Sequence, residues 1–258
     1  MKPKQIEIDL NADLGEYQTE DQYLTESQLL GYLSSCNIAC GGHAGNEETM
    51  QKMILACKQK GVTVGAHPSY PDREGFGRRR IVIDDSALKE SLVSQLLSFL
   101  FVSDALSVPM SHVKAHGRLY NDAARDKNLA HLLVNAIKEI DARVSIVGPP
   151  NSILAEAARN SDLNFIAEAF LDRRYKDAGF LVDRDCPGAI LGSLAERCEQ
   201  ARNIVFNQRV ETESNSFIQI EAKTLCLHGD SPDALETARM VYSLLESENV
   251  LIKNFGCS

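Results

Sequence analysis

The sequence predicts an α/β fold: a single distorted, seven-stranded (β/α) barrel of the TIM type. Short β-like runs recur along the 258 residues, and each is followed by a corner rich in Gly, Asn, His or Pro. Helical patterns alternate with these runs, which favours a parallel sheet with right-handed crossovers. No composition shift or Ser/Pro-rich linker divides the chain, so residues 1–258 are expected to form one domain. An open doubly wound sheet is the alternative.

The expected elements follow one another in a regular order. The strands are residues 6–10, 36–40, 62–66, 112–115, 144–147, 165–170 and 224–228. The helices are residues 48–60, 86–105, 123–140, 151–160, 192–207 and 232–246. Residues 210–221 are expected to form a strand-bearing excursion before the last barrel strand.

Capping residues support several of these helices. The candidates are Asn46 or Glu47, the pair Asp85-Ser86, the pair Asn121-Asp122, and Ser231 followed by Pro232. A short polar side chain before a helix accepts a hydrogen bond from its first backbone N–H groups. Proline fits the first helical turn because its missing N–H is not needed there.

Charge and composition exclude several classes of protein. The net charge is −9, which argues against a nucleic acid or an anionic membrane as partner, since either needs a basic face. The only basic cluster, residues 78–80, is typical of a solvated loop, with contact to an anion as the alternative. The most apolar region, residues 91–110, contains Gln95 and Asp104 and predicts a buried helix rather than a membrane span.

The cysteines and the first residues indicate a reducing, cytoplasmic setting. The seven cysteines are scattered and odd in number, and no pair has zinc-finger spacing, so a disulfide framework is not expected. The opening MKPKQIEIDLNAD is too polar for a signal peptide.

Polar residues gather where the expected strands end. They are Asn11, Asp13, His43, His67, Lys114, His116, Glu168, Asp172, Arg173 and His228. In a parallel barrel the carboxyl ends of all strands open on one face, and that face carries the active site. A single histidine at such a corner is more often a turn or core residue, but four of them together indicate a site. His112 and His131 are left out, as a strand-start residue and a helix residue.

Three chemistries suit such a face. Imidazoles and a carboxylate could hold a divalent metal that activates water, with Asp13, His43, His67 and His116 as candidate ligands. Histidine and Glu168 could instead act as metal-free acid and base, with Lys114 meeting a carboxylate or an oxyanion. A nucleophilic Cys40 is the least favoured. Residues 41–45 lack the Gly-Lys-Ser/Thr ending of a phosphate-binding loop, so no nucleotide site is expected in this chain.

Six segments carry a resemblance to a known family. They are IDLNADLGE (8–16), NIACGGHAG (37–45), GAHPSYPD with GFGRR (65–79), VKAHGRLYN (113–121), EAFLDRRY (168–175) and LHGDSP (227–232). In this order they resemble the LamB/YcsF family, the A component of the bacterial ATP-dependent 5-oxoprolinase, across nearly the whole chain. The resemblance implies a barrel of the glycoside hydrolase/deacetylase type.

The resemblance also implies an activity and partners. The expected reaction is hydrolysis of the lactam of 5-oxo-L-proline to L-glutamate, driven by ATP with Mg²⁺, which subunits B and C would handle. By position, Asp13, His43, His67, His116 and Glu168 are expected to be catalytic. The expected binders of the small anionic substrate are Asn11, Lys114, Asp172, Arg173 and His228. A divalent metal in this chain and assembly into a homo-oligomer are left open.

The chain departs from the family pattern at three positions. The family usually has Lys-Pro-His-Gly-Ala where this chain has Ala115 and Arg118, and an acid where it has Asn46. If that acid caps a helix, asparagine serves nearly as well; if it is a base or ligand, the change is damaging. The rival hypotheses are a metal-dependent deacetylase or carbohydrate hydrolase, and a non-catalytic, lactam-binding subunit.

Overall fold

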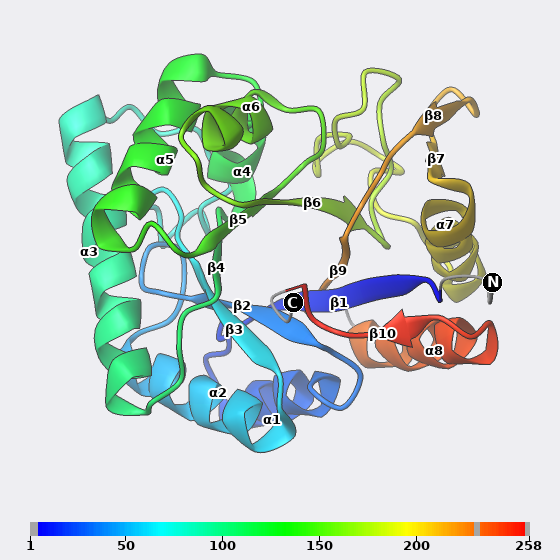
Figure 1. Ribbon diagram of the computed structural model, residues 1–258, viewed down its shortest axis with the longest axis horizontal. Helices are drawn as coiled ribbons and strands as arrows, with labels where there is room; N and C mark the ends of the chain where they lie inside the picture. The colour runs from blue at the N-terminus through cyan, green and yellow to red at the C-terminus, as the bar shows by residue number, and fades with distance from the viewer. Residues whose placement is uncertain (1–4, 230–232, 256–258) are drawn as a thin grey trace.

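Seven parallel strands close into a barrel in the computed structural model, which describes residues 5–229 and 233–255 (Figure 1). The strands are β1 (Glu7–Leu14), β2 (Ser35–Ala39), β3 (Thr63–His67), β4 (His112–Lys114), β5 (Ser145–Gly148), β6 (Phe165–Phe170) and β9 (Thr224–His228). They pair in this order, and β9 pairs with β1 to close the ring. The predicted seven-stranded barrel is therefore confirmed, and the open sheet is wrong.

The helices lie outside the ring of strands (Figure 1). They are α1 (Glu20–Leu29), α2 (Glu47–Lys60), α3 (Asp85–Ala105), α4 (Gly117–Ala123), α5 (Lys127–Ile140), α6 (Ile153–Asn160), α7 (Leu194–Asn207) and α8 (Ala234–Ser247). The sequence did not predict α1, whose apolar residues form only a weak stripe. A capping box between Thr19 and Gln22 starts this helix and was its one local signal.

Two expected helix starts are wrong. Asn121 and Asp122 lie inside α4, a separate short helix, and the cap of the following α5 is Asp126, which accepts from Leu129 N. The cap of α3 is Asp84, one residue before the expected pair. The expected start of the last helix at residues 231–232 lies outside the described residues.

Two smaller sheet elements complete the fold. β7 (Arg209–Glu211) and β8 (Phe217–Gln219) form an antiparallel hairpin, which confirms the strand-bearing excursion. β10 (Leu251–Ile252) pairs with the first residues of β1, beyond the stretch of β1 that pairs with β9. Between β6 and α7, residues 171–193 form a long loop with isolated bridges but no helix or strand.

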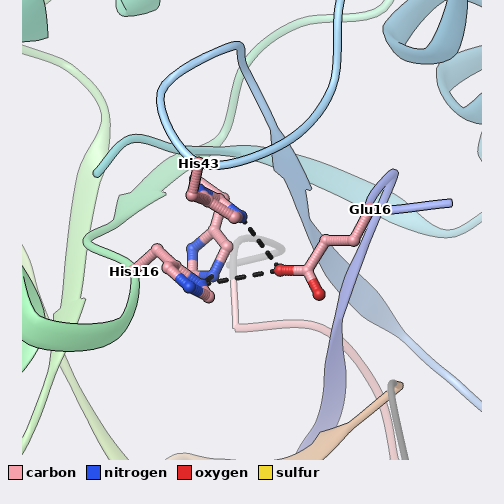
Figure 2. Close-up of side chains that lie close together, drawn as sticks. Glu16, His43 and His116 are labelled. Carbon is pink, nitrogen blue, oxygen red and sulfur yellow. Dashed lines mark hydrogen bonds and ion pairs between the residues drawn. The ribbon is translucent and has the colours of Figure 1, made fainter. Parts of the chain in front are cut away.

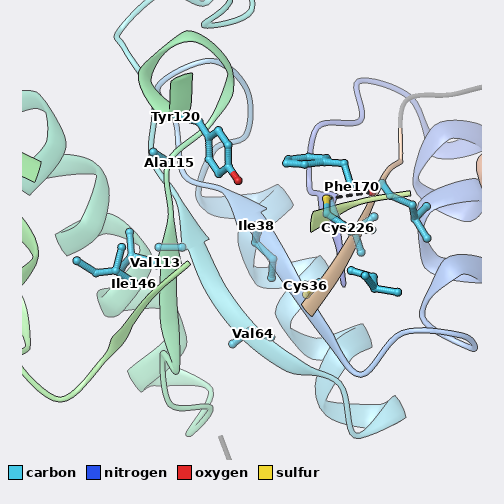
Figure 3. Close-up of a cluster of buried hydrophobic side chains, with 14 of the residues drawn as sticks. Cys36, Ile38, Val64, Val113, Ala115, Tyr120, Ile146, Phe170 and Cys226 are labelled. Atoms are coloured by element: carbon cyan, nitrogen blue, oxygen red, sulfur yellow. Dashed lines mark hydrogen bonds between the residues drawn. The ribbon is translucent and has the colours of Figure 1, made fainter. Parts of the chain in front are cut away.

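The apolar core lies between the barrel and its helices. Apolar side chains of neighbouring strands, among them Cys36, Ile38, Val64, Val113 and Ile146, belong to one buried cluster (Figure 3). The alternate residues of the same strands point into the barrel, because successive side chains of a strand face opposite sides. Among the described residues, no helix has the length and hydrophobicity that a membrane crossing requires.

Candidate active site

The floor of the barrel interior is polar and fully hydrogen-bonded. The Asp9 carboxylate accepts from Ser34 Oγ at 2.6 Å, from Ser35 Oγ at 2.8 Å and from the Thr224 hydroxyl. Thr224 in turn accepts from Asn11 Nδ2 at 2.6 Å. Burial raises the pKa of Asp9 to about 6, although these hydrogen bonds oppose the shift.

A second polar layer lies above this floor. Asn37 Nδ2 donates to Asn11 Oδ1 and to Asp13 Oδ1, each at 2.8 Å, and Asn37 Oδ1 accepts from His112 Nε2 at 2.8 Å. The His112 ring fits because residue 65 is glycine: a Cβ there would lie 2.3 Å from the ring. The sequence left His112 and Asn37 out of the site, yet both support Asp13 from below.

Lys114 crosses the interior and bridges two carboxylates. Its Nζ lies 2.9 Å from Asp13 Oδ1, 2.9 Å from Glu168 Oε1 and 3.0 Å from Cys226 Sγ. Burial opposes the charge, but Asp13, Cys226 and Glu168 outweigh it and raise the pKa of Lys114 well above its usual value. Burial likewise opposes the charge on Asp13, but His67 and Lys114 outweigh it and lower its pKa. All three donors of this ammonium therefore have partners inside the protein.

Two histidines face each other above Lys114, each held by a backbone carbonyl. His67 Nδ1 donates to the Lys114 carbonyl at 2.7 Å, and His116 Nε2 donates to the Phe76 carbonyl at 3.0 Å. A carbonyl only accepts, so these bonds fix the tautomers. When both rings are neutral, His67 Nε2 and His116 Nδ1, which lie 3.0 Å apart, are the nitrogens without a proton. His67 Nε2 also lies 3.3 Å from Asp13 Oδ2.

Glu16 and His43 complete this group from the neighbouring strand ends. Glu16 Oε1 lies 3.0 Å from His43 Nε2 and 3.5 Å from His116 Nδ1 (Figure 2). The His43 and His116 rings stack with their centroids 3.6 Å apart. One ligand atom from each of Glu16, His43, His67 and His116 lies within 4.8 Å of the others, so these residues could hold a metal ion. Sequence reasoning missed Glu16, although it stands three positions after Asp13 at the same corner.

A cavity of about 210 Å³ opens above this group. Of the expected site residues it is lined by Asp13, His67, Lys114, His116, Arg173 and His228. His43 lines an adjoining cavity of about 390 Å³ together with Glu16. Asn11 is buried below Lys114, and Glu168 lines a small separate pocket near Tyr120. Asp172 holds His228, whose Nδ1 lies 2.9 Å from Asp172 Oδ2.

The long loop after β6 forms one wall of the cavity, through residues 181–185. Arg173 is buried beneath this loop and donates to the Val182 carbonyl at 2.6 Å and to the Ala189 carbonyl at 3.4 Å. Gln200 Nε2 on α7 donates to three carbonyls at the start of the loop, including Phe170 O at 2.7 Å. The expected substrate binder Arg173 thus also fixes the cavity wall.

Two of the three positions that depart from the family pattern, Asn46 and Arg118, have clear local roles. Asn46 caps α2: its side chain accepts from Thr49 N at 3.0 Å and completes a capping box. Arg118 lines the cavity and its Nε donates to Asp122 at 2.8 Å, one helical turn further along α4. Asn46 is therefore a structural substitution, whereas Arg118 changes the charge of the cavity wall.

The basic cluster at residues 78–80 was expected either to be a solvated loop or to contact an anion, and its arginines differ in which role they fit. Arg79 pairs with Asp72 at 2.6 Å on the surface. Arg78 lies over the Phe76 ring and lines the cavity, where a guanidinium suits an anion. Arg80 is exposed.

Cys40 does not have the properties of a nucleophile. It is buried, and burial raises the pKa of its thiol to about 12. Because the thiolate is the reactive form, the thiol is inert at neutral pH.

The comparisons with known proteins agree over nearly the full length. The model of the LamB/YcsF family matches residues 8–257. The A component of 5-oxoprolinase from Tolumonas auensis is 38% identical, and the match covers 96% of this chain and 98% of that protein. The protein of the same name from Staphylococcus saprophyticus is 36% identical, and the match covers 97% of this chain and 100% of that protein. A solved structure, described as a lactam utilization protein from Thermus thermophilus, superposes with a TM-score of 0.88 at 33% identity. The superposition covers 97% of this chain and 100% of that protein.

Proposed function

Because this chain belongs to the LamB/YcsF family, we propose that it is the A-type component of an ATP-dependent 5-oxoprolinase. The reaction opens the lactam of 5-oxo-L-proline with water and yields L-glutamate, coupled to the hydrolysis of ATP. The observation that carries the proposal is the convergence of Asp13, His67, Lys114 and His116 on one cavity at the carboxyl ends of the strands. A cavity of about 210 Å³ suits a small molecule.

His67 is the proposed general base. Its Nδ1–H is fixed by the Lys114 carbonyl, so Nε2 is the atom that takes a proton from the attacking water. The imidazolium that forms lies 3.3 Å from the Asp13 carboxylate, which stabilises it. With the γ-phosphoryl group of ATP transferred to the lactam oxygen, water oxygen bonds to the lactam carbon, the C–N bond breaks, and the proton on His67 passes to the ring nitrogen, which leaves as an amine. A second water then cleaves the resulting carboxyl phosphate into the carboxylate of glutamate and inorganic phosphate.

Lys114 and Glu168 act mainly by positioning. The three donors of Lys114 are used by Asp13, Glu168 and Cys226, so Lys114 fixes the Asp13 carboxylate and its positive potential favours a developing oxyanion. Glu168 lies beneath Lys114, and we assign it, with Asn11, to holding that ammonium rather than to direct protonation of the leaving nitrogen.

The substrate carboxylate is proposed to bind on the basic side of the cavity. Arg78, Arg118, Arg173 and Arg184 line it, and guanidinium groups match the geometry of a carboxylate. His228, held by Asp172, also lines the cavity and is proposed to orient the lactam ring.

ATP activation is proposed to occur on partner subunits of the B and C types. An unactivated amide is a poor electrophile, and neither a phosphate-binding loop nor a dinucleotide fingerprint occurs in this sequence. The complex is expected to work in the cytoplasm, where its cysteines stay reduced.

The test is glutamate release from 5-oxo-L-proline with ATP and Mg²⁺, for this chain alone and then with its B-type and C-type partners. Turnover is expected only in the mixture. His67→Ala should reduce it at least about 100-fold. The matched control is His131→Ala, which removes a half-buried histidine of α5 outside the barrel and should leave turnover unchanged.

Two results would contradict the proposal. One is the absence of turnover in a mixture shown by gel filtration to assemble. The other is near-normal turnover of His67→Ala, which would place the chemistry elsewhere. Binding of 5-oxo-L-proline to an assembled but inactive complex would favour the non-catalytic hypothesis.

A further inference from the structure

The facing nitrogens of His67 and His116 need something between them. Each ring donates its other N–H to a carbonyl, so in the neutral rings each presents a lone pair across a gap of 3.0 Å, and the Asp13 carboxylate lies 3.3 Å from the same His67 nitrogen. Two lone pairs repel at this distance unless a proton or a cation lies between them. Backbone carbonyls that fix the outer N–H of a histidine are a usual feature of metal sites, because they orient the ring and set its tautomer.

Glu16 supplies a negative charge at the same point. Its Oε1 lies 3.5 Å from His116 Nδ1. In a tetrahedral zinc site with bonds of about 2.0–2.1 Å, neighbouring ligand atoms are separated by about 3.3 Å. The distance of 3.0 Å between His67 Nε2 and His116 Nδ1 is slightly shorter than that value, and the distance of 3.5 Å between His116 Nδ1 and Glu16 Oε1 is slightly longer.

His43 has a different position in this group. Its ring stacks on His116 with an interplanar angle of 4°, so the two rings cannot both direct an in-plane lone pair at one ion. Its Nε2 lies 3.0 Å from Glu16 Oε1, where an N–H is required, and its Nδ1 is buried without a partner among the described residues. His43 is therefore suited to orienting the Glu16 carboxylate.

We propose that Glu16, His67 and His116 bind one divalent cation of the zinc class, with His43 positioning Glu16. Two imidazoles and one carboxylate are the ligands of hydrolytic zinc sites, which keep a fourth position for water. Of the three ligands, His67 and His116 line the cavity of about 210 Å³ and Glu16 lines the adjoining one. Asp13, the carboxylate expected from the sequence, accepts from Lys114 and Asn37 through Oδ1, and its Oδ2 lies 3.3 Å from His67 Nε2. It does not belong to the group of ligand atoms that Glu16 forms with the histidines.

Binding of the metal is independent of the proposed reaction, but its use rests on the proposed function. A water on the cation would be the nucleophile, since such a cation lowers the pKa of its bound water. His67 would then be a ligand, and the proton of that water would pass to the neighbouring Asp13 carboxylate before it reaches the leaving nitrogen.

The experiment measures metal binding directly on the purified chain. The chain is stripped with a chelator and titrated with Zn²⁺ and with Co²⁺; metal content is measured by mass spectrometry and the cobalt site by its visible absorption. One equivalent is expected for the wild type. The isosteric Glu16→Gln and the variants His67→Ala and His116→Ala should lose it, and His43→Ala should bind about 10–100-fold more weakly.

Matched controls and a second readout make the outcomes distinct. His228→Ala removes a histidine of the same cavity that Asp172 holds, and it should keep the full equivalent with an unchanged cobalt spectrum. Circular dichroism shows whether each variant is folded. A folded wild type that binds neither ion, or a Glu16→Gln variant with unchanged affinity, would overturn the proposed site.

Glutamate release, measured on the same samples with the partner subunits, separates this inference from the proposed function. Turnover by metal-free wild type would remove the metal from the reaction and leave the proposed role in the 5-oxoprolinase complex standing. Stoichiometric metal in an assembled complex without turnover would keep the site and contradict the assigned reaction.

Discussion

Lys114 on β4 and Asp13 on β1 form an ion pair across the barrel interior, with 2.9 Å between Nζ and Oδ1. Both side chains are almost completely buried. Glu168 accepts from the same ammonium, so one buried positive charge balances two buried carboxylates. Removing any one of these charges is therefore expected to destabilise the protein, because the remaining charges stay buried without their partner.

Lys114→Met should destabilise the protein and abolish turnover. Removing one partner of a buried ion pair costs about 3–5 kcal/mol, because the remaining carboxylates stay buried without a counter-charge. Denaturant unfolding of Lys114→Met, Asp13→Asn and the double variant measures this coupling. The loss in the double variant should be clearly smaller than the sum of the single losses. Strict additivity would show that the two residues do not interact.

Asp9→Asn should alter how stability depends on pH. Burial raises the folded pKa of Asp9 to about 6 from 3.8, so the protonated form is favoured in the fold. The stabilisation from this group is complete below the unfolded pKa and is lost as the pH rises through about 6. As the pH rises from the unfolded pKa to above about 6, the wild type loses this stabilisation and Asp9→Asn does not. The unfolding free energy of the variant should therefore rise by up to about 3 kcal/mol relative to that of wild type.

Chemical unfolding at a series of pH values tests this difference. The exposed Asp104→Asn is the control and should follow the wild-type curve. A constant difference between Asp9→Asn and wild type across the window would contradict the raised pKa.

Gly117→Ala should impair the site more than the fold. Gly117 has a φ of +56°, and a Cβ there would lie 2.8 Å from the Gly77 carbonyl oxygen. Moving that loop disturbs the Phe76 carbonyl, which fixes His116. We expect a loss of about 1 kcal/mol or more in stability from the strained backbone, and a larger fractional loss in kcat.

Gly61→Ala is the matched control for this glycine. Gly61 ends α2 with a φ of +71°, and an added Cβ would meet nothing within 4 Å. Its variant should show similar backbone strain with unchanged kcat. Equal activities of the two variants would mean that the contact at Gly77 does not hold His116.

Arg118→Ala, which restores the usual family residue, should have a small effect. The Arg118–Asp122 pair is partly exposed, with the Arg118 side chain 37% accessible, so it contributes less than about 1 kcal/mol to stability. The change is expected to raise KM for 5-oxo-L-proline a few-fold and to leave kcat unchanged. A loss of kcat would show that Arg118 contacts the reacting atoms.

Much of the fold could be predicted from the sequence because the strands are short, apolar and well separated. Each of the seven barrel strands overlaps the range expected for it, because polar corners mark where strands end. The end of the first strand was wrong: β1 continues to Leu14, so Asn11 and Asp13 lie in the strand and not in the corner after it. α4 was missed because Asn121 and Asp122 resemble a helix cap, so the expected helix began only at residue 123. β10 was missed because two residues carry no pattern of their own.

The site was predicted as a region rather than as a set of contacts. The strand-end rule brought Asp13, His67, Lys114 and His116 to one face, and they line one cavity. Which histidines the carboxylates of Asp13 and Glu16 approach depends on side-chain rotamers, which the sequence does not specify. The same holds for Asn37 and His112, whose roles follow from the register of β1, β2 and β4.

The closure of the barrel by β1 and β9 has a consequence for biosynthesis. Asp9 and its partner Thr224 are 215 positions apart, so β1 leaves the ribosome long before β9 exists. During that time one edge of β1 has unsatisfied N–H and C=O groups, which favour pairing with other chains. Such long-range pairing also slows folding. Nascent chains that stop before β9 should therefore engage chaperones and aggregate, whereas release of the full sequence should allow the ring to close.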